Sequence, residues 1–94
     1  MADDTTGVFA ISVAAAMVSM EVQNLRVYER RGLLEPHRTE GGTRLYSRAD
    51  VERLHRIRNL LAEGLNLAGI GRVLDLEAEV LRLRAQNRRL RDRS

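Results

Sequence analysis

The stretch SVAAAMVSMEVQNLRVYERRG, residues 12–32, decides the fold. Ser12 is a good helix N-cap, and the apolar run 13–19 after it predicts a short helix. A two-residue break follows, and the pattern then predicts a second helix over 22–31. Gly32 stands where a residue in the left-handed conformation would end that helix. Two short helices joined by a tight break are typical of a helix-turn-helix.

A basic β-hairpin is expected next along the chain. The short extended runs 37–39 and 43–46 flank Glu40-Gly41-Gly42, and a Gly-Gly pair between extended runs favours a hairpin. Arg38 and Arg44 each lie on one of these runs. The sequence therefore predicts a positively charged wing beside the two helices.

Two longer helices complete the predicted architecture. Ser47 and Asp50 form a capping box, which starts a third helix of roughly 48–62. Asn66 can cap a fourth helix that begins at Leu67. The fold class is therefore mostly α, a winged helix-turn-helix followed by a C-terminal dimerisation helix.

The end of the fourth helix carries a heptad pattern. Val73, Val80 and Asn87 occupy a positions, and Leu76, Leu83 and Leu90 occupy d positions. β-Branched residues at a with Leu at d favour two-stranded coiled coils, and a buried Asn at a can fix their register. The alternative is an amphipathic helix that packs on its own domain.

The charges of this helix favour antiparallel pairing. Residues 81–94 contain six Arg and one Asp, a net charge of +5, whereas Asp75, Glu77 and Glu79 lie near the other end. An antiparallel partner brings these unlike charges together, and a parallel partner places the arginines opposite one another.

The chain is expected to comprise three parts. Residues 1–8 are small and polar and predict a disordered tail. Residues 9–72, which begin with a short strand over 9–11, form the winged helix-turn-helix domain. Residues 73–94 form the coiled-coil dimerisation helix.

The composition excludes several classes of protein. The chain has 94 residues, three aromatic residues and no cysteine, which leaves no thiol chemistry and no zinc finger. No membrane-spanning run or signal peptide stands out, so we expect a cytoplasmic protein. His37 and His55 have no ligand-like neighbours, and no catalytic motif is present. We therefore expect no enzyme activity, no cofactor and no metal site.

The second helix carries side chains suited to reading DNA. Gln23, Asn24 and Arg26 lie near its N-terminal end, where a recognition helix enters the major groove. Gln and Asn can bond two-point to adenine, and Arg to guanine. Double-stranded DNA is the partner that this arrangement predicts.

Taken together, these residues resemble a known family. The ordered series is Leu25-Arg26-Val27-Tyr28-Glu29-Arg30, Gly32-Leu33-Leu34, Pro36, Arg38-Thr39, Arg44-Leu45-Tyr46-Ser47 and Asp50-Val51. Over about residues 9–75 it resembles the DNA-binding domain of the MerR family of transcriptional regulators. Within the family, Ile11-Ser12-Val13-Ala14-Ala15 and Asn66-Leu67-Ala68-Gly69-Ile70 resemble the actinobacterial heat-shock repressors, the HspR subgroup. Many relatives have a Gly at the position of Ser19 and an aromatic residue at that of Val27.

The resemblance implies a function and a set of contacts. It implies a homodimer joined by an antiparallel coiled coil, a palindromic operator, and DNA that is bent or untwisted in the complex. Arg26 and Tyr28 would contact DNA directly, and Arg38, Arg44 and Tyr46 on the wing would bind phosphate or the adjacent minor groove. The subgroup implies a repressor of heat-shock or stress genes with a DnaK-type chaperone as a partner.

Two other functions fit the residues. One is a small architectural or excisionase-like protein that bends DNA and senses nothing. The other is a coiled-coil adaptor that binds a chaperone or polymerase and uses DNA only incidentally. A cooperative filament on DNA would indicate the first, and the lack of a preferred DNA sequence would indicate the second.

Overall fold

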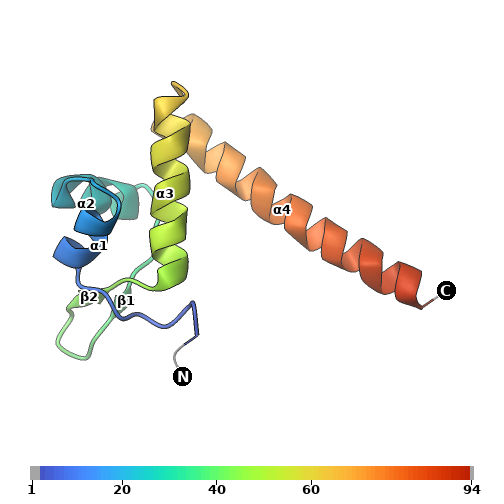
Figure 1. Cartoon of the computed structure of the whole chain (residues 1–94), viewed down its shortest axis with the longest axis horizontal. Helices are drawn as coiled ribbons and strands as arrows, with labels where there is room; N and C mark the ends of the chain where they lie inside the picture. Colours follow the sequence, from blue (N-terminus) through green and yellow to red (C-terminus); the bar gives the residue numbers. More distant parts are fainter. Residues whose placement is uncertain (1–2, 94) are drawn as a thin grey trace. The chain divides into compact units, whose positions relative to one another are not determined.

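The computed structural model describes residues 3–93 as two compact units, one up to residue 60 and one from residue 61 onward. We call residues 3–60 the head. The elements are mostly helical, as predicted, and are labelled in Figure 1: α1 (Ile11–Met17), α2 (Val22–Arg30), β1 (His37–Arg38), β2 (Arg44–Leu45), α3 (Arg48–Ala62) and α4 (Leu67–Asp92).

The first helix starts earlier than the sequence predicts. Helix α1 begins at Ile11, its N-cap is Ala10, and no side chain caps it, so the prediction of Ser12 as N-cap is wrong. The preceding residue, Phe9, exchanges backbone hydrogen bonds with Tyr46, at 2.9 Å and 2.7 Å. This pairing holds the chain extended up to Phe9, and the helix starts where the pairing ends.

Helix α2 has the limits that the sequence predicts, to within one residue. Gly32 has a φ of +75°, and the backbone N–H of Leu33 donates to the carbonyl of Tyr28 at 2.9 Å. A positive φ is readily adopted by glycine, so Gly32 ends the helix and turns the chain back toward the core. Between α1 and α2, Ser19 has a φ of +55°, a left-handed conformation that favours Gly, the residue that the resemblance implies here.

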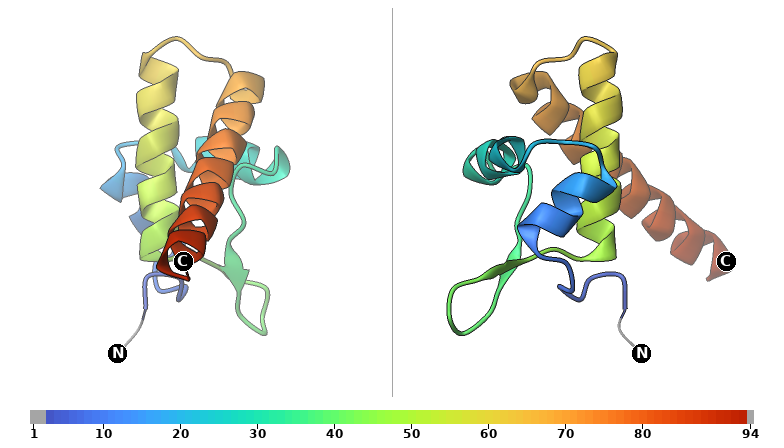
Figure 2. Two further views of the ribbon diagram at one scale, coloured as in Figure 1. Left: turned by 90° about the vertical axis from the view of Figure 1, so that its right-hand side faces the viewer. Right: turned by 60° about the vertical axis from the view of Figure 1, so that its left-hand side comes forward.

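The wing is a two-stranded antiparallel hairpin. His37 pairs with Leu45 and Arg38 with Arg44, and the N–H of Thr39 donates to the carbonyl of Thr43 at 2.9 Å. Both views of Figure 2 show the hairpin extending beyond the helices of the head. The predicted basic wing is therefore present, with its two arginines directly opposite each other.

The structure differs from the predicted disordered tail at residues 3–8, while residues 1 and 2 lie outside the described residues. The N–H of Ala49 donates to the carbonyl of Asp4 at 2.8 Å, and the N–H of Val8 donates to that of Tyr46 at 3.0 Å. A Cβ at Gly7 would lie 3.0 Å from the Cβ of His37. Polar composition suggested disorder, but these residues bond the start of α3 and the end of the hairpin.

The head encloses an apolar core. Its buried side chains come from both short helices, the connecting segment, the hairpin and α3: Ala14, Ala15, Val18, Leu25, Tyr28, Leu33, Leu34, Tyr46, Val51, Leu54, Ile57 and Leu60. The predicted capping box of α3 is present, since Ser47 N donates to Asp50 at 2.8 Å and Asp50 N donates to Ser47 Oγ at 3.0 Å. Figure 1 shows α1 and α2 on the same side of α3.

Helix α4 is the main element of the second unit. Asn66 caps it as predicted, accepting a hydrogen bond from the N–H of Gly69 at 2.8 Å. Its buried residues are Ile70 and Leu74, both in its first turns. Among residues 3–93 no helix combines the length and the apolar character that crossing a bilayer requires.

Candidate nucleic-acid interface

Helix α2 presents three polar side chains to solvent. Gln23, Asn24 and Arg26 are all exposed, whereas Leu25 and Tyr28 on the other side of the helix are buried. Within the described residues, none of the three polar side chains forms a hydrogen bond or ion pair. Their donors and acceptors are therefore available to base edges in a major groove.

The structure corrects the expectation for the two tyrosines. Tyr46 is 0% exposed and Tyr28 is 4% exposed. A fully buried side chain cannot touch DNA, so the expected direct contact from Tyr46 is wrong in this conformation, and Tyr28 belongs mainly to the core.

The wing arginines share one counter-ion, Glu29 of α2. Oε1 of Glu29 accepts from Nη2 of Arg38 at 2.6 Å, and Oε2 accepts from Nε of Arg44 at 2.6 Å. The side chain of Glu29 is 18% exposed, against 47% for Arg38 and 31% for Arg44. A carboxylate from the helix therefore holds both strands of the wing.

Sequence reasoning missed Glu29, although a signal for it exists. The predicted hairpin places Arg38 opposite Arg44, and like charges directly opposite each other destabilise a strand pair. Such a pair calls for a nearby acid, and the end of α2 precedes the hairpin by only a few residues. The register of the hairpin therefore indicates that a carboxylate on α2 lies near both arginines.

Tyr46 is close enough to this ion-pair cluster for the charges of Glu29, Arg38 and Arg44 to act on its pKa. Its hydroxyl is buried without a hydrogen-bond partner among the residues that the structure describes. Burial raises the pKa of Tyr46 above its ordinary value, and the negative charge of Glu29 raises it further. Burial also raises the pKa of Tyr28. Both phenols therefore stay neutral throughout the physiological range.

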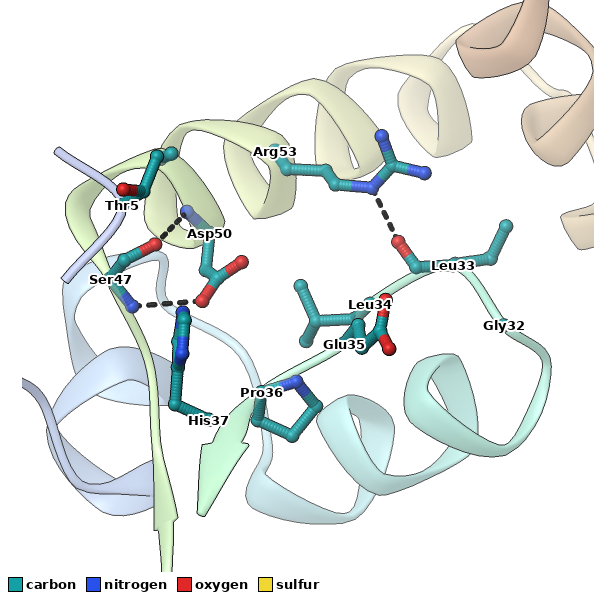
Figure 3. A pocket seen from close by; sticks show the side chains of 11 residues that line it. Thr5, Gly32, Leu33, Leu34, Glu35, Pro36, His37, Ser47, Asp50 and Arg53 are labelled. Carbon is teal, nitrogen blue, oxygen red and sulfur yellow. Dashed lines mark hydrogen bonds between the residues drawn. The ribbon is translucent and has the colours of Figure 1, made fainter. Parts of the chain in front are cut away.

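A pocket of about 510 Å³ lies where the chain passes from α2 to the wing (Figure 3). Inside it, Nε of Arg53 donates to the carbonyl of Leu33, so Arg53 is a structural residue that holds the segment after α2. The capping box of α3 lies on the same side of the pocket as Arg53, and the segment 33–36 lies across from both (Figure 3). The hydrogen bonds in the pocket thus fix the segment that follows α2. Within residues 3–93, no three His, Cys, Asp or Glu side chains are grouped so that they could hold a metal ion.

The predicted seam of α4 is open to solvent. Val73 is partly buried, and the other five seam residues, Leu76, Val80, Leu83, Asn87 and Leu90, are exposed. Large apolar side chains in a row on an exposed helix are typical of an interaction surface. Glu79 and Arg82 form an ion pair within the helix.

The geometry agrees with comparisons to known proteins. The sequence profile of the MerR HTH family regulatory protein matches residues 9–77. The chain is 45% identical over 84 residues to a protein of Streptomyces coelicolor named for heat shock, HspR, covering 88% of this chain and 56% of that one. It is 41% identical over 66 residues to the HTH-type transcriptional regulator GlnR of Bacillus anthracis, covering 70% of this chain and 51% of that one.

A solved structure extends the comparison to a complex. The fold matches HiNmlR, described as a MerR family regulator lacking the sensor domain and bound to promoter DNA, with a TM-score of 0.69 and 27% identity. The match covers 74% of this chain and 54% of that one. The chain thus spans about half the length of the curated relatives cited above.

Proposed function

The chain belongs to the MerR family of helix-turn-helix regulatory proteins, and from that premise we propose that it represses heat-shock or stress genes as a homodimer on an inverted-repeat operator. The premise supports binding to double-stranded DNA, because a relative of the same fold is bound to promoter DNA. The likeness to HspR of Streptomyces coelicolor, which is named for heat shock, supports the choice of stress genes. The resemblance of residues 11–15 and 66–70 to the heat-shock repressors supports repression.

One observation carries this proposal. The exposed side of α2 bears Gln23, Asn24 and Arg26 without internal partners, and the ion pairs of Glu29 place the basic wing directly beside the end of that helix. Side chains that read base edges and cations that bind phosphate are the two components of a specific DNA interface. The head supplies both from adjacent elements.

The proposal assigns dimerisation to α4. One head makes few base contacts, whereas two heads about 34 Å apart reach successive major-groove turns of a palindrome. The exposed apolar seam from Leu76 to Leu90 supports an antiparallel pair of helices as the link. In such a pair the basic end of each helix lies near Asp75, Glu77 and Glu79 of the other.

The test separates base reading from phosphate binding. The probes are a duplex that the intact chain selects from a random-sequence pool and a scrambled duplex of equal length. We expect Arg26→Ala to weaken binding to the selected duplex by about 1–3 kcal/mol and to relax its sequence preference. We expect Arg44→Ala to weaken binding to both duplexes alike and to reduce the salt slope by about one unit.

Three results would contradict the proposal. Selection of no preferred sequence would indicate the adaptor function. Cooperative coating of long DNA would indicate the architectural function. Equal binding of the selected duplex by Arg26→Ala and the unchanged chain would remove α2 as the reading element.

We further propose a DnaK-type chaperone as the partner that stabilises the DNA-bound form, so that heat draws it away. The resemblance of residues 11–15 and 66–70 to the heat-shock repressors is what supports this. Purified DnaK-type chaperone should tighten binding to the selected duplex, and unfolded protein added as a competitor should reverse the effect. An affinity that is indifferent to the chaperone would exclude it as a partner of this chain.

A further inference from the structure

The ion pairs of Glu29 join two parts of the interface that do different work. The carboxylate projects from α2, which carries the base-reading side chains, and binds one cation on each strand of the wing at 2.6 Å. Arg38 is also held by the wing itself, because its Nη1 donates to the carbonyl of Gly42 at 3.1 Å. One carboxylate therefore connects α2, β1 and β2.

We propose that Glu29 is a positioning residue that sets the register between the recognition helix and the wing arginines, and thereby governs discrimination between DNA sequences. The inference rests on the proposed function, since it assigns a role within the same interface. Phosphate contacts fix how a protein is placed on a duplex, and base contacts read the sequence from that placement. The wing can guide the helix only if the two are rigidly connected.

The ion pair between Arg44 and Glu29 leaves part of the Arg44 guanidinium available to DNA. The bond from Arg44 to Glu29 uses Nε, so both terminal nitrogens of that guanidinium stay available for a phosphate. The carboxylate also separates the positive charges of Arg38 and Arg44, which are register partners in the hairpin. Without it the two guanidiniums repel each other and lose their common orientation.

The sign of the charge argues for positioning and against affinity. A carboxylate beside a phosphate-binding surface repels DNA and lowers non-specific binding. A side chain selected for affinity alone would not be acidic at this position. On the proposal the benefit of Glu29 lies in geometry, so its loss should affect the two kinds of binding in opposite directions.

Glu29→Gln tests the proposal, with Glu40→Gln as the matched control. Glu40 lies at the exposed wing tip, and its side chain forms no hydrogen bond or ion pair within residues 3–93. The probes are the selected duplex and its scrambled counterpart. We expect both variants to bind the scrambled duplex at least as tightly as the unchanged chain, because each removes one negative charge.

The two variants should differ in the ratio of the two affinities. We expect Glu29→Gln to lower the preference for the selected duplex by about tenfold, comparable with one mismatched base pair, and Glu40→Gln to leave it within about twofold. Glu29→Asp, which keeps the charge and shortens the reach, should lower the preference without tightening non-specific binding.

Two results would overturn the proposal. An unchanged preference in Glu29→Gln would show that the helix keeps its register without the carboxylate. Equal losses on both duplexes, in Glu29→Gln and Glu29→Asp alike, would show that Glu29 serves only stability, which thermal unfolding of each variant would register. If the unchanged chain itself prefers no DNA sequence, the proposed function fails. That result comes from the intact chain alone, before any variant is measured.

Discussion

The head and helix α4 differ in whether their large apolar side chains are buried or exposed. The head draws buried side chains from both short helices, the hairpin and α3. In α4 burial stops at Leu74, and Leu76, Val80, Leu81, Leu83 and Leu90 are all exposed. The head therefore buries its large apolar side chains within the chain, whereas most of α4 leaves its large apolar side chains exposed. We infer that α4 specifies association and the head specifies recognition.

The largest expected effect comes from breaking the seam of α4. Leu83→Asp puts a charge at a d position, so the proposed dimer should dissociate and operator binding should fall to the non-specific level, about a thousandfold or more. Sedimentation and binding to the selected duplex measure the two consequences.

Leu81→Asp is the matched control for this substitution. Leu81 is 67% exposed, against 49% for Leu83, but it lies outside the a and d positions. It should leave both the dimer and operator binding intact. Equal effects of the two substitutions would show that the heptad seam is not the surface that pairs.

The next largest effect concerns the stability of the head, which should depend on its buried side chains. Leu54 of α3 is completely buried, so Leu54→Ala should lower the free energy of unfolding by about 2–5 kcal/mol. Chemical unfolding measures this loss, which should be found at every protein concentration in a monomeric background such as Leu83→Asp. A loss below about 1 kcal/mol would mean that the head is not a closely packed unit.

The smallest effect on stability concerns the hydroxyl group of Tyr46, which is buried in the head without a hydrogen-bond partner among the described residues. Tyr46→Phe removes a buried hydroxyl that has no partner among the described residues, so it should stabilise the protein by about 1 kcal/mol. A thermal or chemical unfolding curve at neutral pH measures the gain. A clear loss of stability would mean that the hydroxyl has a bonded partner.

The same tyrosine predicts a response to alkaline pH. Because the pKa of Tyr46 in the folded state is raised above 10.0, the unfolded chain loses the phenol proton first. The contribution of the neutral phenol to the free energy of unfolding is complete below about pH 10, and it is lost as the pH rises through the pKa of Tyr46 in the folded state. Tyr46→Phe should make this decline shallower, with the share of Tyr28 remaining.

Local chemistry made much of the fold predictable. Gly32, the Ser47 and Asp50 capping box, and the Asn66 cap all act through neighbours a few residues away, so each could be predicted from its own stretch of sequence. The start of α1 and the order of residues 3–8 depend on pairing with Tyr46, which is far away in sequence. Polarity and capping preference cannot detect such contacts.

In the candidate site, too, features set by local sequence could be predicted, and features set by contacts between distant residues could not. The exposure of Gln23, Asn24 and Arg26 follows from the period of one helix, and it was predictable. The burial of Tyr46 and the binding of two wing arginines by Glu29 depend on how the hairpin folds against α2. Residue type alone indicated which side chains could bind DNA, and tertiary packing decided which of them are accessible.

The central claim is that two heads, joined through α4, read one operator. Sedimentation equilibrium of the intact chain, alone and with the selected inverted-repeat duplex, tests it most directly. The account predicts twice the mass of a single chain in solution and two chains on each duplex. A single-chain mass in solution, with one chain on each duplex, would contradict it.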